Sequence, residues 1–279
     1  MTVVVSLFDL LLLVLVALAP ALAYLAWVRK GERRQTEGWG TLAGGFVYGA
    51  IFATLVAGVL ELVLVALGTT VSQHYPAPEF VFLNGNSTAG SFFLVLVLAP
   101  FVEEALKASG VAARNARISR LADGPVVGAS VGLGFGFFET FLYGLGAYVV
   151  GGLEAGIALI LVRSISSVLL HGSSTGMFGY GYARAKFGVR GPGSGAYYLL
   201  AVAMHATFNT LASVAVILAL VGVTGVAAEV GAFVALLVAI VFAVGAIEHV
   251  RAITQSADYP ALQPRPTPAP VARPPAKGR

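Results

Sequence analysis

The chain has 279 residues, of which 58% are hydrophobic and only 11% charged, and its long apolar blocks exclude a water-soluble globule and indicate membrane spans. The formal net charge of +4 comes from basic residues spread among the segments between these blocks, so we expect no nucleic-acid partner. The absence of cysteine excludes disulfide bonds, thiolate metal ligands and a cysteine nucleophile.

Seven apolar segments are long enough to cross a bilayer as helices. They cover roughly residues 5–28, 41–68, 90–111, 125–150, 156–183, 196–221 and 225–249. Sixteen of the seventeen Lys and Arg residues follow the first, third, fifth and seventh segments, which predicts an N-terminus outside and a C-terminus in the cytoplasm. The predicted fold is an all-α, polytopic bundle of about seven transmembrane helices, placed in the cell membrane.

The chain divides into one helical domain and a tail. Residues 1–258 are expected to form a single transmembrane helical domain. Residues 259–279 contain seven prolines, which cannot continue a helix, so we predict a disordered, Pro-rich cytoplasmic tail there.

Two adjacent carboxylates, Glu103 and Glu104, follow the apolar run that ends at Pro100. A charge at bilayer depth costs at least ~2.5 kcal/mol, so such residues usually mark a functional site. Glu103 and Lys107 share a helix face, which allows one glutamate to pair with Lys107 while the other stays available. Pro100 lacks a donor and is expected to interrupt the helix just before the pair. The alternative is a helix end where these charges meet lipid headgroups.

The fourth span combines small residues with one deep acid. Gly128, Gly132 and Gly136 form a stripe at four-residue spacing, which predicts close packing against another helix. Glu139 lies roughly 21 Å from the cytoplasmic start of this span and needs a partner or a proton. A protonated Glu139 bonded to a neighbouring helix is the structural alternative.

Polar side chains continue on the next two spans. The fifth span carries a stripe at four-residue steps that must face protein or water, formed by Arg163, Ser167, His171 and Thr175. Arg163, inside the fifth span, is also the one exception to the distribution of basic residues described above. On the sixth span, His205 and Asn209 share a face, an arrangement that taken alone is more often a structural hydrogen-bonding pair than a catalytic one.

Depth in the membrane connects these residues. At 1.5 Å per residue, Glu103, Glu139, His171 and His205 all fall between the cytoplasmic third and the midplane, so four helices offer ionisable groups to one layer. The other ionisable residues of the spans lie near span ends or lack companions. We interpret them as interfacial or structural, and they are Asp9, Glu61, Glu229, Glu248 and His249.

Three kinds of chemistry fit such a layer. A glutamate can take a proton from water while His or Asn donors stabilise the oxyanion formed at a carbonyl. The same residue types bind Zn²⁺ and activate its water. They also form proton relays in transporters. The residues alone leave all three open.

Three motifs stand in order on separate spans: Glu-Glu-x-x-Lys at 103–107, Phe-x-x-x-Glu at 135–139 and His-x-x-x-Asn at 205–209. Together they resemble the PrsW family of intramembrane proteases, which is related to the CAAX-processing and bacteriocin-processing membrane proteases. The wider group often has His at the position of Glu139 and Arg at that of Lys107, which favours the PrsW branch. His171 also resembles a His-containing segment of that branch. The resemblance places the catalytic core at about 90–221.

The resemblance implies hydrolysis of a peptide bond of a membrane-anchored protein substrate, in or near the lipid bilayer. Glu103 corresponds to the base that activates water, and Glu104 and Lys107 would set its charge and orientation. His205 and Asn209 match the segment for oxyanion stabilisation or water positioning. Two further residues complete the polar cavity, Glu139 and His171, and Arg163 supports them.

The family has been described both as metalloproteases and as glutamic-type proteases. The glutamate-rich set and the lack of a His-Glu-x-x-His helix favour a glutamic-type enzyme without a cofactor. If zinc is present, the expected ligands are Glu103, Glu139, His171 and His205. Two other classes fit the same residues: a proton-coupled transporter or channel, and a non-catalytic scaffold that binds membrane helices in the glycine-lined groove.

Overall fold

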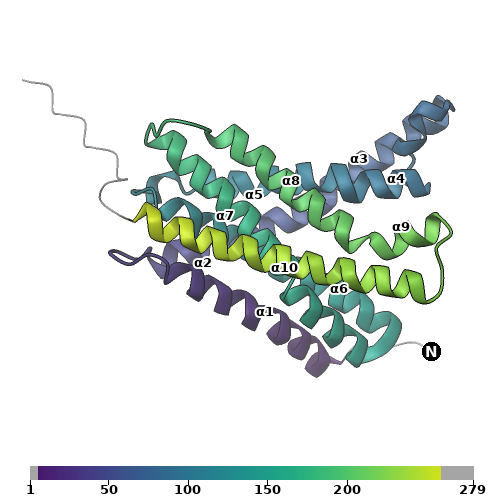
Figure 1. The fold of residues 1–279 in the computed structure, drawn as a ribbon, viewed down its shortest axis with the longest axis horizontal. Coiled ribbons are helices and arrows are strands. Elements are labelled where there is room, and N and C mark those ends of the chain that lie inside the picture. The colour runs from purple at the N-terminus through teal and green to yellow at the C-terminus, as the bar shows by residue number, and fades with distance from the viewer. Residues whose placement is uncertain (1–5, 259–279) are drawn as a thin grey trace, which may run out of the picture.

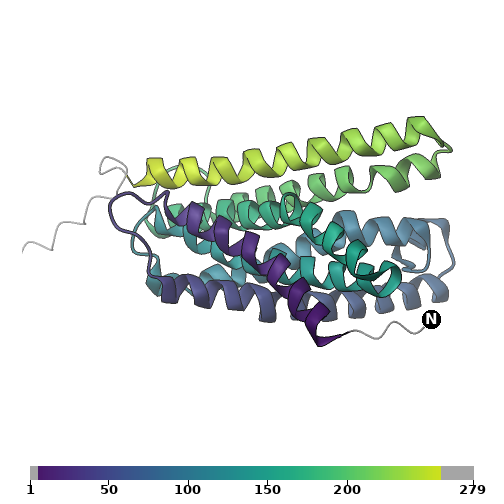
Figure 2. The ribbon, with the colours of Figure 1, turned by 90° about the horizontal axis from the view of Figure 1, so that it is seen from below.

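The computed structural model describes residues 6–258, and every regular element in that range is a helix, which confirms the all-α prediction. The tail predicted at 259–279 lies outside the described residues. The helices lie side by side in an elongated bundle (Figure 1 and Figure 2). In chain order the elements are α1 (Leu7–Arg29), α2 (Trp39–Val47), η1 (Tyr48–Ala53), α3 (Thr54–His74), η2 (Pro78–Leu83), α4 (Thr88–Phe93), η3 (Leu94–Leu98), α5 (Ala99–Ala112), η4 (Asn115–Arg117), α6 (Asp123–Ser164), α7 (Ser167–Lys186), α8 (Ser194–Ala212), α9 (Val214–Leu220) and α10 (Val226–Ala257).

Several of these elements are suited to a bilayer. Five helical stretches are long and apolar enough to cross a membrane, and a sixth is added when α8 and α9, bent by 57° relative to each other, count as one span. Large apolar side chains such as Leu62 and Val150 are exposed on the outside, where lipid would cover them. The chain is therefore a multi-pass membrane protein, while the count of seven spans and the orientation of the termini stay predictions.

Helix α6 folds back on itself at Gly152. This glycine has φ 80° and ψ −177°, a backbone conformation that residues with a side chain rarely adopt. Beyond it the chain returns along the first arm, so that a Cβ atom on Gly144 would lie only 2.3 Å from Ile160 Cγ1. The predicted segments 125–150 and 156–183 lie on either side of this turn, and the second continues into α7.

The glycine stripe of α6 packs directly against α7. A Cβ atom on Gly128 would lie 2.2 Å from the carbonyl oxygen of Thr175, and one on Gly132 would lie 2.0 Å from that of His171. No side chain fits at these positions unless α7 moves, so the prediction of close packing is confirmed. This contact sets the height of His171 relative to α6.

The third predicted span is irregular just before the paired glutamates. Pro100 occupies the first turn of α5, and the preceding turn, η3, is a π-helix rather than an α-helix. Proline has no N–H to donate to the preceding turn, which favours such a local widening of the helix. The predicted irregularity is present as a π-helical turn, within a helical stretch that continues from Thr88 to Ala112.

Candidate active site

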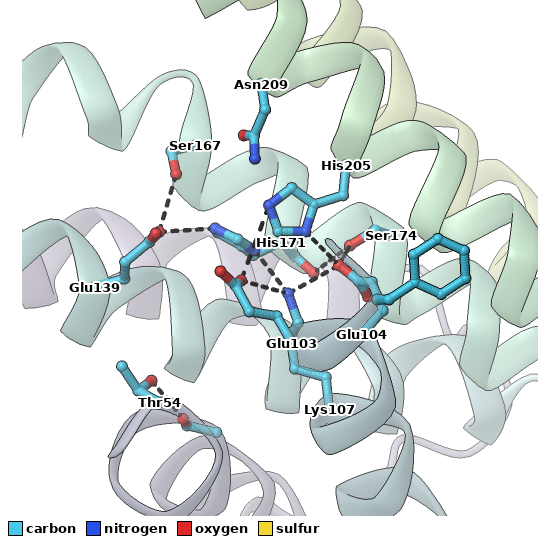
Figure 3. Close-up of polar contacts among 12 residues, drawn as sticks. Thr54, Glu103, Glu104, Lys107, Glu139, Ser167, His171, Ser174, His205 and Asn209 are labelled. Carbon is cyan, nitrogen blue, oxygen red and sulfur yellow. Dashed lines mark hydrogen bonds and ion pairs between the residues drawn. The ribbon is translucent and has the colours of Figure 1, made fainter. Parts of the chain in front are cut away.

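A cavity of about 460 Å³, here called the central cavity, lies among α3, the η3–α5 segment, α6, α7 and α8. Glu103, Glu139, His171 and Asn209 all line it, so the structure brings together predicted site residues from four helices. Figure 3 shows these side chains converging from separate helices. Six residues meet here in what we call the acid–histidine cluster: Glu103, Glu104, Lys107, Glu139, His171 and His205.

Lys107 is completely buried between the two adjacent glutamates. Its Nζ lies 2.8 Å from Glu104 Oε1 and 3.5 Å from Glu103 Oε2. The sequence allowed one glutamate to remain free of Lys107, but residues three and four positions before a helical lysine are both within its reach. A buried ammonium between two carboxylates also avoids leaving either charge uncompensated.

His171 is held from both sides of its ring. Its Nδ1 lies 2.9 Å from Lys107 Nζ, and its Nε2 lies 2.8 Å from Glu139 Oε2 (Figure 3). An ammonium can only donate, so Nδ1 accepts, and Nε2 carries the proton that is donated to Glu139. The lone pair of His171 therefore faces the centre of the acid–histidine cluster.

His205 is fixed in a comparable way by Glu104. Its Nδ1 lies 3.1 Å from Glu104 Oε1, which also accepts a hydrogen bond of 3.0 Å from the Ser174 hydroxyl. Because the carboxylate accepts, Nδ1 of His205 carries the proton. Nε2, 3.9 Å from Glu103 Oε2, is then left with its lone pair towards that carboxylate.

Glu139 is the acceptor for three donors. Besides His171, its Oε2 receives a hydrogen bond of 2.7 Å from Arg163 Nη2 and one of 3.4 Å from Ser167 Oγ. The predicted polar stripe thus reaches the site through Arg163, Ser167 and His171. Thr175 does not take part, because it packs against Gly132, which leaves its hydroxyl without a partner among the described residues.

Two residues of the site were not predicted. Glu61 was interpreted as interfacial or structural, but it lines the central cavity, and its buried Oε1 has no hydrogen-bond partner among residues 6–258. A lone acid within an apolar span was the available signal. Ser174, which contacts Glu104, lies three residues after His171, on a neighbouring position of the same helix.

Comparison with models of known protein families matches residues 37–245 to PrsW-protease, described as the PrsW family intramembrane metalloprotease. The matched range is about three quarters of the chain and includes the whole acid–histidine cluster. The chain belongs to the PrsW family. This confirms the resemblance read from the three motifs and shows a multi-pass intramembrane protease. Neither a search of curated proteins nor one of solved structures found a match.

The site of this PrsW family member has the donor set of a metal centre. One ligand atom each from Glu103, His171 and His205 lie within 4.8 Å of one another, and all three residues are buried. Two histidines and a glutamate are a known set of catalytic zinc ligands. The ring nitrogen that does not bind zinc usually donates its hydrogen to a carboxylate, and here Glu139 accepts from His171 and Glu104 from His205. Glu139, expected as a fourth ligand, is not among these three residues, and its Oε2 receives the hydrogen bond from His171 Nε2.

The Lys107 ammonium marks the cluster as a place for positive charge. It is within hydrogen-bonding range of the proposed ligand atom of His171 and lies 3.5 Å from Glu103 Oε2, so a cation already stands beside two of the three donors. The residues of the cluster therefore fit a metal ion by donor type and burial, and a bound metal would take the place that the Lys107 ammonium now holds beside His171.

Proposed function

We propose that this chain hydrolyses a peptide bond of a membrane-anchored protein inside the bilayer, with water activated at Glu103, His171 and His205. The observation that supports it most strongly is that one ligand atom from each of these three buried side chains lies within 4.8 Å of the others. Two of the three residues, Glu103 and His171, line the central cavity. Hydrolysis needs a water molecule, a proton acceptor and stabilisation of the oxyanion at the same point.

Glu103 is the proposed proton acceptor. Its carboxylate lines the central cavity, whereas Glu104 lies deeper and is occupied by Lys107, His205 and Ser174. The second glutamate therefore orients His205 and balances the charge of Lys107. This division gives the two adjacent carboxylates different tasks, because their surroundings differ.

Asn209 is the proposed donor to the oxyanion of the substrate carbonyl. One hydrogen of its Nδ2 is used in a bond of 2.8 Å to the carbonyl oxygen of Val95. An amide nitrogen has two hydrogens, so a second one is available at the cavity wall. The bond to Val95 fixes the direction of that second hydrogen, and such pre-oriented donors stabilise charge as it develops.

Glu103, His171 and His205 would also hold a zinc ion, which when bound supplies a Lewis acid and a water of lowered pKa. Glu139 and Glu104 keep the protons on the outer ring nitrogens of the two histidines and so turn the inner lone pairs towards the cluster. Lys107 Nζ donates to the inner lone pair of His171 and would have to move aside for a metal ion. The same side chains thus support either form of water activation.

The function is tested by reconstituting the purified chain in liposomes with a single-span reporter substrate. We expect the reporter to be cleaved and no solute flux to be driven by a proton gradient. Flux without cleavage would identify a transporter and contradict the proposal. Reporter binding without cleavage, unchanged by substitution of Glu103 or His205, would identify a scaffold.

The metal ion has a separate test in the elemental content of the purified protein. We expect about one zinc per chain, reduced to background in His171→Ala and in His205→Ala. His249→Ala is the matched control, because His249 is exposed on α10 and does not line the central cavity. Zinc-free protein that cleaves the reporter in the presence of chelator would contradict the metal centre and leave Glu103 to act as the base alone.

A further inference from the structure

A second cavity, of about 600 Å³, lies away from the acid–histidine cluster, between the beginning of α2 and the end of α5. Gly40 and Thr41 contribute one side of its lining, and Arg114 and Arg117 contribute the other. We call it the arginine cavity. Among the side chains that line it there are two cations and no acid.

Arg114 is held in place without any carboxylate. Its guanidinium donates hydrogen bonds to the carbonyl oxygens of Gly110 and Gly44 and lies 5.3 Å from the centre of the Tyr48 ring. No described acidic residue forms an ion pair with it. Burial lowers the pKa of Arg114, and its contacts are two carbonyl oxygens and a ring, none of which carries a full negative charge. A nearby anion would supply the missing compensation.

Arg117 adds a second, more accessible charge. It is exposed at the end of η4, and its side chain has no hydrogen-bond or ion-pair partner among residues 6–258. On the opposite wall lies the N-terminus of α2, which has no side-chain cap, although the Glu37 carboxylate just before it accepts a hydrogen bond from the Gly38 N–H. The planar guanidinium groups of two arginines match the geometry and charge of a phosphate. A neutral ligand would leave both positive charges without a counter-charge.

The surroundings of the arginine cavity match the edge of a bilayer. Trp39, the first residue of α2, is 51% exposed and stacks under Arg29, and tryptophan is enriched at membrane interfaces. Further along the same helical segment, exposed apolar side chains follow at four-residue spacing, which would accommodate acyl chains. They are Val47, Ile51 and Leu55.

We propose that the arginine cavity binds the phosphate of an anionic phospholipid, with Arg114 and Arg117 as the cationic contacts and the acyl chains along the exposed face of the α2–α3 segment. A free phosphate could satisfy the two arginines, but it would leave the apolar strip beside them unused. The phospholipid satisfies both features. This site is independent of the proposed catalysis, since none of its residues lines the central cavity.

Fluorescence of Trp39 provides a direct test. The chain has two tryptophans, so a Trp27→Phe background leaves Trp39 as the reporter beside the cavity. Brominated phosphatidylglycerol and brominated phosphatidylcholine are each titrated against the full chain in mixed micelles. We expect phosphatidylglycerol to quench with several-fold higher affinity. One arginine near an anionic surface changes the affinity about fivefold, so we expect Arg117→Gln to lose about that much affinity for phosphatidylglycerol.

Control variants distinguish a built site from general attraction to basic residues. Arg190→Gln removes one exposed charge in the loop between α7 and α8 and should keep the preference. Gly40→Leu places a bulky side chain in the lining of the cavity and should abolish the preference. The fold should tolerate this change, because no atom lies within 4 Å of the added Cβ. Equal affinities for the two lipids, or equal losses in Arg117→Gln and Arg190→Gln, would overturn the proposal. Displacement by millimolar inorganic phosphate would assign the cavity to free phosphate instead.

Discussion

Glu139 acts on the rest of the acid–histidine cluster through His171. Its Oε2 lies 2.8 Å from His171 Nε2 and is held on the other side by Arg163. The carboxylate thereby keeps the proton on the outer nitrogen of the ring and turns Nδ1 towards the cluster. In this account Glu139 is a positioning residue, and its effect on chemistry depends on the ring that it orients.

Replacing this carboxylate by an amide tests that role. We expect Glu139→Gln to weaken zinc binding and to slow reporter cleavage by about 10–100-fold each, the usual effect of losing a partner of a metal-bound histidine. Zinc affinity and the pH profile of kcat are the measurements. Glu154→Gln is the control, because Glu154 is an exposed acid on the same helix. An unchanged zinc affinity and pH profile would contradict the positioning role.

At the scale of elements, the α6 hairpin and α7 form the frame of the site. The first arm of α6 presents glycines to α7, so the two backbones approach closely enough to exclude side chains. Glu139 and His171 lie on these two helices and face each other. The distance between them therefore depends on the glycine contact.

A single methyl group should disturb this frame. Gly132→Ala places a Cβ atom 2.0 Å from the backbone oxygen of His171, and we expect a loss of about 1–3 kcal/mol in stability together with reduced cleavage. Gly146→Ala, on the same helix with no atom within 4 Å of the added Cβ, should retain both. Thermal unfolding in detergent and reporter cleavage are the measurements. Equal behaviour of the two variants would show that the close contact is not required.

At the scale of the whole molecule, one arginine forms ion pairs with residues from three distant parts of the chain. Arg120 forms ion pairs of 3.2 Å with Glu32 after α1, 2.6 Å with Asp123 at the start of α6 and 2.8 Å with Asp258 after α10. Asp258 also accepts backbone hydrogen bonds from Arg33 and Arg34. Three acids around one guanidinium leave an excess of negative charge in this group of residues around Arg120.

This excess charge predicts a pH dependence of stability. Burial, with Asp123 nearby, raises the pKa of Glu32 from 4.5 to about 8, although the Glu37 N–H and Arg120 oppose the shift. The folded chain then holds the proton more tightly than the unfolded chain, so this contribution to stability is lost as the pH rises from 4.5 towards 8. As the pH rises from 5 to 8, we expect the Tm of Glu32→Gln to fall less than the Tm of the parent chain. The same slope in both proteins would contradict the assignment, and Glu79→Gln, at an exposed acid, is the control.

The sequence predicted the layer of ionisable groups because helix geometry converts residue spacing into height along a span. It could not predict rotation and packing. Glu61 was interpreted as interfacial or structural, and only the packing of α3 against α5 brings it to the central cavity. Likewise, the motif indicated that Lys107 neutralises a glutamate, but the closer pairing with Glu104 depends on the positions of His205 and Ser174 on other helices.

The central claim is that Glu103, with His171 and His205, activates the water that cleaves a membrane-anchored substrate. The most direct measurement is the cleavage rate of a single-span reporter in liposomes by Glu103→Gln and by the parent chain, with Tm recorded for both. The amide keeps the shape of the side chain but cannot take a proton, so we expect a loss of about 10²–10⁴-fold in a folded protein. Cleavage by folded Glu103→Gln at the parent rate would contradict the account.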